Sequence, residues 1–437
     1  MNSKARLSLV IFIFITTIIN SVQQMIPPNL ITISNYFGFG GDTAPLGVLT
    51  FTFTLVSGIA MVIFGYLADK LVRKWLVFFG VLTYSLFAAL IFLVPNTDNG
   101  FRLFYLLTMF SGAGFGATVP SVFSLIADII RQEDRSKGFS FFSIANLLGM
   151  MVGIILSTFL GQLNWKLPYL IIGIIGLVSA FLMIGFQEPP RLGGNIDIEN
   201  PPEISYRIKK EDLPIIFSKK SNIWLILNFV DTIPTGIILF LIYTFMKSEH
   251  NMPESLTLLF LGFILLSTLV GTIIFGYVGD SLFKRGNKKA RVQLALIANI
   301  APIPFVFIAL LIPFRMEDGA TIGVIFQTQG AILMLSLMVI GLFINGAVNG
   351  SWYATVVDLN LPEHRGTVLA TANFFDIIGK ALGPLIAGFV TDHYGIMAGM
   401  TSSIFAWILL PLFWISLWRN CEQDMMKVDM EIANRFK

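Results

Sequence analysis

Cysteine, histidine and charge are the scarce components of this sequence. A single cysteine, Cys421, occurs among the 437 residues, which excludes an intrachain disulfide and argues against a cysteine-based metal site. The three histidines, His250, His364 and His393, are far apart and have no partner at ligand spacing, so we expect them to be solvated loop residues. The sequence therefore predicts neither a metal site nor a cofactor.

Charged residues make up only 13% of the chain, against roughly 25% in soluble globular domains. Hydrophobic residues make up 55%, and the mean hydropathy is +0.78. One water-soluble core could not bury so much apolar surface, because cores divide into separate domains well below this size. The composition predicts a membrane protein, and a net charge of only +3 gives no reason to expect a nucleic-acid partner.

The apolar residues are grouped into runs that are long enough to cross a membrane. A helix needs about 20 residues to cross about 30 Å of hydrocarbon. The first run follows Lys4 and Arg6 as a signal peptide would, but it is one of a dozen similar segments, so we expect a retained helix. Part of 319–358 could instead form an outer loop or an amphipathic stretch. The twelve expected spans are 8–33, 46–67, 75–94, 102–126, 139–162, 167–186, 222–246, 255–278, 292–313, 330–357, 367–390 and 396–418.

The positive charges predict the orientation of these spans. If the N-terminus is cytoplasmic, all but five of the 29 Lys and Arg residues lie in the cytoplasm; the exceptions are Arg102, Lys166, Lys247, Arg315 and Lys380. Membrane proteins carry such an excess in their cytoplasmic loops, and an odd number of spans would scramble it. We expect a multi-pass protein of the cell membrane, surrounded by lipids, with both termini cytoplasmic and with a monomer sufficient for function.

The longest polar interval, 188–221, divides the chain into two halves. It contains "EPPRLGG", "ENPPE" and charges of both signs, which is typical of a solvated linker. We expect an N-terminal six-helix bundle over 1–187, a cytoplasmic linker over 188–221, a C-terminal six-helix bundle over 222–420 and a cytoplasmic tail over 421–437.

The two halves share a repeated pattern. The sequence "IFGYLADKLVRK" begins at residue 63 and "IFGYVGDSLFKR" begins at residue 274, an offset of 211 positions. The same offset places Asn20 of span 1 on Asp231 of span 7, and Asp128 at the end of span 4 corresponds to Asp358 at the end of span 10. A repeat of six spans is typical of a secondary transporter, and the even number makes the two halves parallel.

Several stretches resemble the Major Facilitator Superfamily. "GYLADKLVRK" resembles the family's signature loop, apart from Val72 where the family usually has Gly. "GMMVGIILSTFLGQLNWKLPYL" at 149–170 and "PEHRGTVLATANFFDIIGKALGPLIAGFVTDHYG" at 362–395 are similar to later family patterns. The resemblance covers essentially the whole chain, with a weaker resemblance to spinster-like members. It implies an all-α membrane protein of twelve helices in two pseudo-symmetric six-helix bundles, with spans 1, 4, 7 and 10 lining a central cavity.

The repeated loops predict a conformational latch at the cytoplasmic ends of the helices. Asp69 would be stabilised by the N-terminus of span 11 near Gly366, and Arg73 could pair with Asp128. Glycines in the loop motif would let another helix approach closely. The alternative is an ordinary positively charged loop. The expected latch residues are Gly65, Asp69, Arg73 and Asp128 in the first half and Gly276, Asp280, Arg285 and Asp358 in the second.

Few charges lie inside the predicted spans, and such charges are usually functional. Asp231 lies in span 7, whereas Asp376 and Lys380 lie roughly 15–21 Å deep in span 11, on one helix face. Asp376 and Lys380 could neutralise one another, or they could bind substrate and protons. Amides add polar groups that could also simply join helices; the candidates for substrate binding or coupling are Asn20, Gln24, Asn228 and Asn373. Asn146 of span 5 and Asn373 of span 11 match at an offset of 227.

These observations predict a transporter rather than an enzyme. The sequence contains no nucleophile–base pair or nucleotide site, and Thr108 stands where the family's drug–proton antiporters place an arginine. We expect a secondary active transporter that moves a small organic solute by alternating access and is driven by protons. The alternatives are a non-transporting sensor or receptor on the same scaffold, and an uncoupled facilitator of organic anions or lipids.

Overall fold

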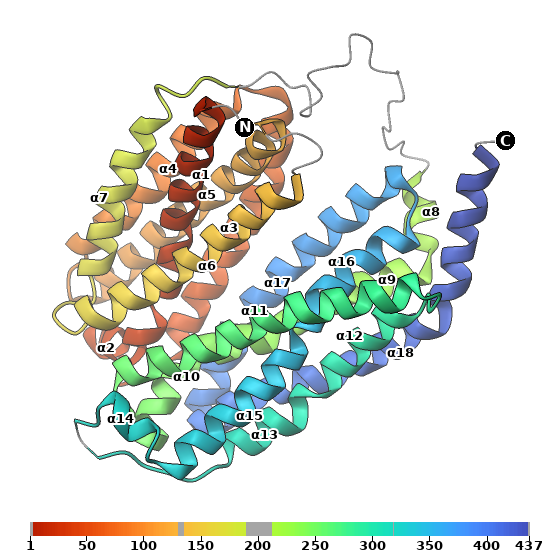
Figure 1. Ribbon diagram of the computed structural model, residues 1–437. Coiled ribbons are helices and arrows are strands. Elements are labelled where there is room, and N and C mark those ends of the chain that lie inside the picture. The colour runs from red at the N-terminus through yellow and green to blue at the C-terminus, as the bar shows by residue number, and fades with distance from the viewer. Residues whose placement is uncertain (1–2, 130–134, 189–211, 318, 436–437) are drawn as a thin grey trace. The chain divides into compact units, whose positions relative to one another are not determined.

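The computed structural model describes residues 3–129, 135–188, 212–317 and 319–435 of the chain, and no β-strand occurs among them. By its internal contacts the chain divides into two units, Met1–Pro202 and Glu203–Lys437, and this boundary falls inside the predicted linker 188–221. Figure 1 shows the first unit in red to yellow and the second in green to blue.

Unit 1 holds the first six apolar segments. Its elements are α1 (Ser3–Ser21), η1 (Val22–Gln24), η2 (Pro27–Asn29), α2 (Leu30–Tyr36), α3 (Ala44–Lys70), α4 (Arg73–Leu90), η3 (Ile91–Leu93), α5 (Asp98–Ile129), α6 (Arg135–Leu160) and α7 (Leu167–Leu182). Helix α5 packs against α3 and α4, while α1 packs against α6 and α7. Span 1 is broken between α1 and α2, where Pro27 and Pro28 remove two N–H donors from the backbone.

Unit 2 holds the other six. Its elements are α8 (Asp212–Ser218), α9 (Lys220–Leu227), η5 (Asn228–Asp231), α10 (Thr232–His250), α11 (Glu254–Lys284), α12 (Ala290–Ile300), α13 (Pro302–Leu310), α14 (Ile322–Ile325), α15 (Gln329–Asn345), α16 (Ala347–Leu359), α17 (Pro362–Tyr394) and α18 (Ile396–Arg435). Span 7 is broken as span 1 is, because the 3₁₀ turn η5 separates α9 from α10. Pro234 then lies in the first turn of α10, where helices tolerate its missing N–H.

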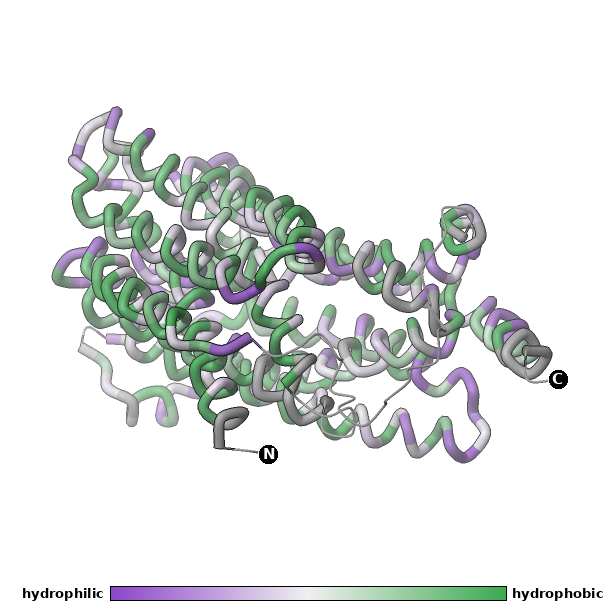
Figure 2. The backbone as a smooth tube through the Cα atoms, turned by 90° about the horizontal axis from the view of Figure 1, so that it is seen from above, coloured by the Kyte–Doolittle hydropathy of each residue, from purple (hydrophilic) through white to green (hydrophobic). Residues whose placement is uncertain are grey.

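The described helices have the lengths and the surfaces that a bilayer requires. Ten of them are long and apolar enough to cross a membrane, and two shorter apolar helices, Ile144–Leu160 and Leu167–Leu182, complete the twelve expected segments. Large apolar side chains such as Leu266 and Ile273 of α11 are more than half exposed, which suits contact with lipid tails rather than water. Figure 2 shows hydrophobic residues along most helices and hydrophilic residues at many of the connecting turns.

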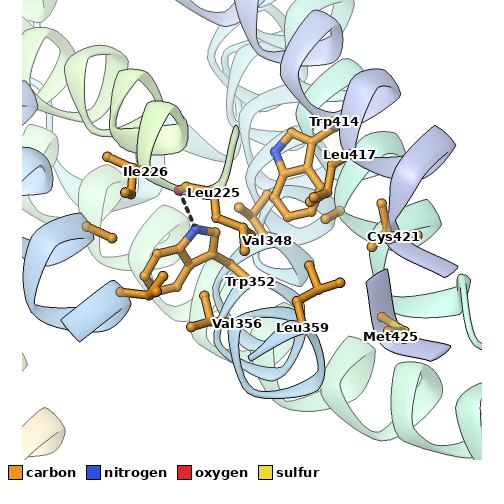
Figure 3. Packing of buried hydrophobic residues seen from close by; sticks show 14 of the residues in the cluster. Leu225, Ile226, Val348, Trp352, Val356, Leu359, Trp414, Leu417, Cys421 and Met425 are labelled. Atoms are coloured by element: carbon orange, nitrogen blue, oxygen red, sulfur yellow. Dashed lines mark hydrogen bonds between the residues drawn. The ribbon is translucent and has the colours of Figure 1, made fainter. Parts of the chain in front are cut away.

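Two segments of the predicted linker and tail are helical and belong to the core of unit 2. Helix α8 lies within the expected linker, and its Ile216 is buried. Helix α18 continues to Arg435, through the residues expected to form the tail, and its Cys421 and Met425 belong to a buried cluster with residues of α9 and α16 (Figure 3). Cys421, the one cysteine of the chain, is a free thiol in this apolar cluster.

Glycines bring the first and fifth spans of each unit into close contact. A Cβ atom on Gly153 of α6 would overlap the carbonyl oxygen of Ser21 in α1. A Cβ atom on Gly383 of α17 would lie 2.7 Å from the Cα of Gly236 in α10. The two crossings share a pattern, "NLLGMMVG" from Asn146 and "DIIGKALG" from Asp376. The contacts therefore match Asn146 with Asp376, not with Asn373 as we expected from the sequence.

This packing predicts that Gly383→Ala destabilises the protein. The added methyl group would meet the backbone of Gly236 and Ile233, which can only move apart, and overpacking of this kind costs about 1–3 kcal/mol. Thermal unfolding in detergent measures the loss. Gly262→Ala in α11 is the matched control, because nothing lies within 4 Å of the added Cβ there. Equal melting temperatures for the two variants would contradict the close crossing.

Candidate functional site

The break in span 7 places two polar side chains against the last helix. Asn228 and Asp231 stand at the two ends of η5, three residues apart and so on one side of the turn. Trp414 of α18 donates its indole N–H to Asn228 Oδ1 at 2.8 Å, and Trp407 donates to Asp231 Oδ1 at 3.3 Å. The two tryptophans are seven residues apart, which puts them on one face of α18.

A third tryptophan binds the same segment from span 10. Trp352 of α16 donates its indole N–H to the carbonyl oxygen of Leu225 at 2.9 Å, as the dashed line in Figure 3 shows. Carbonyl groups at the end of a helix lack their usual intrahelical partners, and α9 ends two residues later, at Leu227. The carbonyl group of Leu225 at the break is thus satisfied by a buried side chain, as a bilayer requires.

Helix α17 brings the second carboxylate to the same place. Thr232 Oγ1 donates to the backbone carbonyl of Asp376 at 3.1 Å, one residue after Asp231 in the chain. The carboxylates of Asp231 and Asp376 are close enough to interact electrostatically, and Tyr353 of α16 lies within similar range of Asp376. Spans 7, 10, 11 and 12 of unit 2 therefore meet around two acidic groups.

Lys380 is available for an external partner. It is exposed, it lies one turn beyond Asp376 on α17, and no ion pair within 4.0 Å joins it to Asp376 or to any other carboxylate that the structure describes. Asp376 and Lys380 interact electrostatically without a direct contact, so whether they serve as a structural pair or bind substrate and protons stays a prediction. Asn373 is also exposed, and its spacing from Asp376 and Lys380 places the three on one face of α17.

Unit 1 offers only uncharged groups at the matching positions. Asn20, which aligns with Asp231, is buried and donates its amide to the carbonyl of Thr16 in its own helix at 2.8 Å. Asn146 aligns with Asp376 in the glycine pattern. Gln24 is half-buried on η1, whereas its neighbour Gln23 helps to line a cavity of about 10 Å³, which has room for about one water molecule. The ionisable part of the site belongs to unit 2.

Arg73 forms an ion pair that sequence reasoning missed. It is buried at the start of α4, and its Nε donates to Glu188 Oε1 at 2.9 Å, while Nη1 donates to Ser124 Oγ at 2.9 Å. Glu188 also accepts hydrogen bonds from the backbone N–H groups of Arg73 and Lys74. These groups have no acceptor within the helix because they lie in its first turn. The side chains of Asp69 and Asp128 lie outside the described ones, so their expected contacts stay predictions.

These bonds keep Glu188 ionised. Burial alone would raise the pKa of Glu188, but the side chain of Arg73 and the two backbone N–H groups outweigh it and hold that pKa below its usual 4.5. Because the pKa of Glu188 is lower in the folded state than in the unfolded state, its ionised form stabilises the fold fully at a pH above the unfolded-state pKa. This stabilisation is lost as the pH falls through the lower folded-state pKa. Glu188 therefore carries no proton at neutral pH and cannot account for pH-dependent transport there.

In unit 2 the corresponding cation is Arg291, and the prediction of Arg285 is corrected. Arg291 Nη2 lies 2.6 Å from Asp280 Oδ1, and Nη1 contacts Asp358 Oδ2. Arg285 is exposed and pairs with no carboxylate among the described residues. The loop after α11 is longer than the loop after α3 and turns at Gly286, whose φ is +97°. The start of α12 therefore supplies the cation, as the start of α4 does in unit 1.

The glycines of the loop motif do not act as the sequence predicted within their own units. A Cβ on Gly65 would lie 3.8 Å from Pro120 Cβ, an ordinary contact, and nothing lies within 4 Å of a Cβ on Gly276. The close helix crossings occur instead at the glycines of α6 and α17.

The comparisons with known proteins agree with this architecture. The family model for the Major Facilitator Superfamily matches residues 10–316. The chain belongs to the Major Facilitator Superfamily. It is similar to the hexuronate transporter of Bacillus subtilis (strain 168), with 24% identity over 91% of each chain. It is also similar to the quinolone resistance protein NorA of Staphylococcus aureus (strain MRSA252), with 21% identity over 79% of this chain and 81% of NorA.

The fold is also that of a solved facilitator-superfamily structure. A bacterial homologue of the human lysosomal transporter Spinster, crystallised inward-facing and unoccupied, superposes with a TM-score of 0.81 at 16% identity, over 97% of this chain and 99% of the homologue. The predictions of a twelve-helix facilitator fold and of a multi-pass membrane protein are confirmed. The chain is a transporter-family protein and not an enzyme.

Proposed function

We propose that this protein is a proton-coupled secondary transporter for a small organic anion. The observation that carries the proposal is the group formed by Asp231, Asp376 and Lys380, in which the two carboxylates interact electrostatically and the ammonium has no described ion-pair partner. Ionisable side chains are costly inside a membrane and usually mark the path of a substrate or a proton. The three ionisable side chains on spans 7 and 11 would bind both the substrate and the proton.

The chemistry of the group supports coupling between the proton and the anion. The carboxylate of Asp376 and a bound substrate anion would compete for Lys380, which lies one turn away on the same helix face. A proton on Asp376 removes its negative charge and leaves Lys380 to the substrate. Loading both together keeps the net charge of the site unchanged, so the site could move across a low-dielectric barrier in the loaded form. Alternating access would then open the site to one side at a time.

The relatives support this substrate class. The B. subtilis relative that aligns over 91% of the chain is named for hexuronate, a sugar that carries a carboxylate and hydroxyl groups. A carboxylate suits Lys380, and hydroxyl groups suit the amide of Asn373 on the same face of α17. NorA is named for quinolone resistance; Thr108, where the drug–proton antiporters place an arginine, favours the anion transporter for this chain.

The ion pairs of Arg73 and Arg291 would hold together the helix ends of each unit that carry the residues expected to form the latch. In each unit they tie the starts of α4 or α12 to acidic groups from neighbouring segments, so the ends of these helices would move as a group. We place the latch residues and both termini on the inner side of the cell membrane. The loops on that side would carry most of the Lys and Arg residues, as cytoplasmic loops usually do.

Flux into proteoliposomes tests the proposal. Purified protein is reconstituted with an acidic exterior and a neutral interior, and radiolabelled glucuronate and galacturonate are supplied outside. We expect the uronate to accumulate above its external concentration, by about tenfold per pH unit for one proton. A proton ionophore should abolish the accumulation, and glucose, which lacks the carboxylate, should not accumulate. Downhill flux that ignores the pH gradient would indicate an uncoupled facilitator, and absence of flux across a panel of organic anions would favour the sensor.

A further inference from the structure

The last helix of the chain contacts the candidate site through two equivalent side chains. Trp407 and Trp414 of α18 are each only 1% exposed, and each directs its indole N–H to one end of η5. The bond of Trp407 is 3.3 Å long and that of Trp414 is 2.8 Å long, and their acceptors also differ. Trp414 binds the amide oxygen of Asn228, which does not titrate, whereas Trp407 binds a carboxylate oxygen of Asp231.

We propose that Trp407 is a positioning residue whose hydrogen bond favours the ionised form of the Asp231 carboxylate and so shifts the pH range of transport. This inference rests on the proposed function and deepens it. An indole N–H can donate a hydrogen bond but cannot accept one. It therefore stabilises an ionised carboxylate more than a protonated carboxyl group, because hydrogen bonds to charged acceptors are the stronger ones.

The surroundings of Asp231 make this donor important. The ionisable group that interacts with it is Asp376 of α17, and Asp376 in turn interacts with Lys380 of α17 and with Tyr353 of α16. On α9 and α10 the nearest ionisable residues, Lys220 and Tyr243, are about three turns along the helices. Asp376 disfavours a second negative charge nearby, and burial does the same. Among the described side chains, Trp407 is the one that donates a hydrogen bond to the carboxylate of Asp231.

The position of Trp407 is determined by the packing of α18. This helix contacts α9, α10, α17 and η5, so the indole is enclosed by the same elements that form the site. A change in the distance between α18 and η5 would therefore alter the strength of the bond. The proton affinity of the site is then linked to the placement of span 12, a helix outside the group that the family resemblance assigns to the cavity lining.

The experiment compares Trp407→Phe with Trp414→Phe in the full-length reconstituted protein. Both variants keep a buried aromatic ring and lose one indole N–H, and melting temperatures establish that both are folded. The carboxyl stretching bands of the protein are titrated by infrared difference spectroscopy, and Asp231→Asn and Asp376→Asn identify the bands. In Trp407→Phe we expect the Asp231 band to titrate about one pH unit higher than in the wild type, and in Trp414→Phe we expect no shift.

A second measurement serves if Trp407→Phe does not fold. With ¹⁵N-labelled tryptophan in the wild-type protein, one indole N–H resonance should shift with pH, and the shift should disappear in Asp231→Asn. No resonance with this behaviour, or equal shifts of the Asp231 band in the two tryptophan variants, would overturn the inference. Because these readouts do not measure flux, they remain decisive even if uronate accumulation proves independent of the pH gradient, which would overturn only the proposed function.

Discussion

Lys380→Met is expected to reduce uptake of the transported anion by roughly a hundredfold, because losing one partner of a desolvated charge pair costs about 2–5 kcal/mol. Lys380 is exposed and has no described ion-pair partner, so its ammonium group is free to bind the carboxylate of the substrate. Its loss would leave that carboxylate without a counter-charge in the membrane. Initial rates of radiolabelled uronate uptake over a range of concentrations, at a fixed pH gradient, measure the effect.

The matched variants separate charge from shape. Lys380→Arg keeps the positive charge and should retain part of the uptake, although a guanidinium does not replace an ammonium group perfectly. Lys380→Glu reverses the charge and should abolish uptake. Asn373→Ala removes a neutral neighbour on the same face of α17. We expect it to reduce uronate uptake less than Lys380→Met does, and the size of that reduction measures the contribution of a hydrogen bond alone. Wild-type uptake by Lys380→Met would show that the anion binds elsewhere.

The fold could be predicted because its main signals are local. Apolar runs of about 20 residues mark spans whatever their neighbours are, and the repeated loop motif shows where the halves align. The positions of the helix breaks were harder to predict. The break in span 1 follows from Pro27 and Pro28, but η5 in span 7 contains no proline, and Asp231 seemed to lie inside a continuous helix. The length of α18 was also missed, because residues after Asn420 are polar and the sequence does not show that Cys421 and Met425 pack against the bundle.

The candidate site could be predicted only in part, because its residues come from distant segments. Asp231 and Asp376 were identified as charges within spans, but their proximity depends on the glycine crossing of α10 and α17. Trp407 could not be recognised, since a tryptophan in an apolar span is typical of any membrane helix. Arg291 was missed because an insertion in the loop separates it from Asp280, whereas Arg73 follows Asp69 closely. Glu188 had a weak signal, an acidic residue directly after span 6.

Replacing the carboxylate that carries the coupling proton, by Asp376→Asn or by Asp231→Asn, is expected to abolish accumulation against a gradient while leaving downhill exchange in place. An amide cannot take up and release a proton, so a variant that lacks the proton-carrying carboxylate loses the link between the pH gradient and the substrate. Accumulation driven by a one-unit pH gradient should fall from about tenfold to none. Counterflow, in which internal unlabelled uronate exchanges for external labelled uronate, needs no net proton movement and should continue.

The two variants also distinguish the roles of the two carboxylates. If Asp376 carries the proton, Asp376→Asn alone loses accumulation, while Asp231→Asn changes the pH at which accumulation is half-maximal, because it removes a neighbouring negative charge. If Asp231 carries it, the two results exchange. Asn146→Asp places a carboxylate at the matching position of unit 1. Combined with Asp376→Asn or with Asp231→Asn, it controls for a general effect of charge, because it should not restore accumulation. Full accumulation in both aspartate variants would show that neither group couples protons to transport.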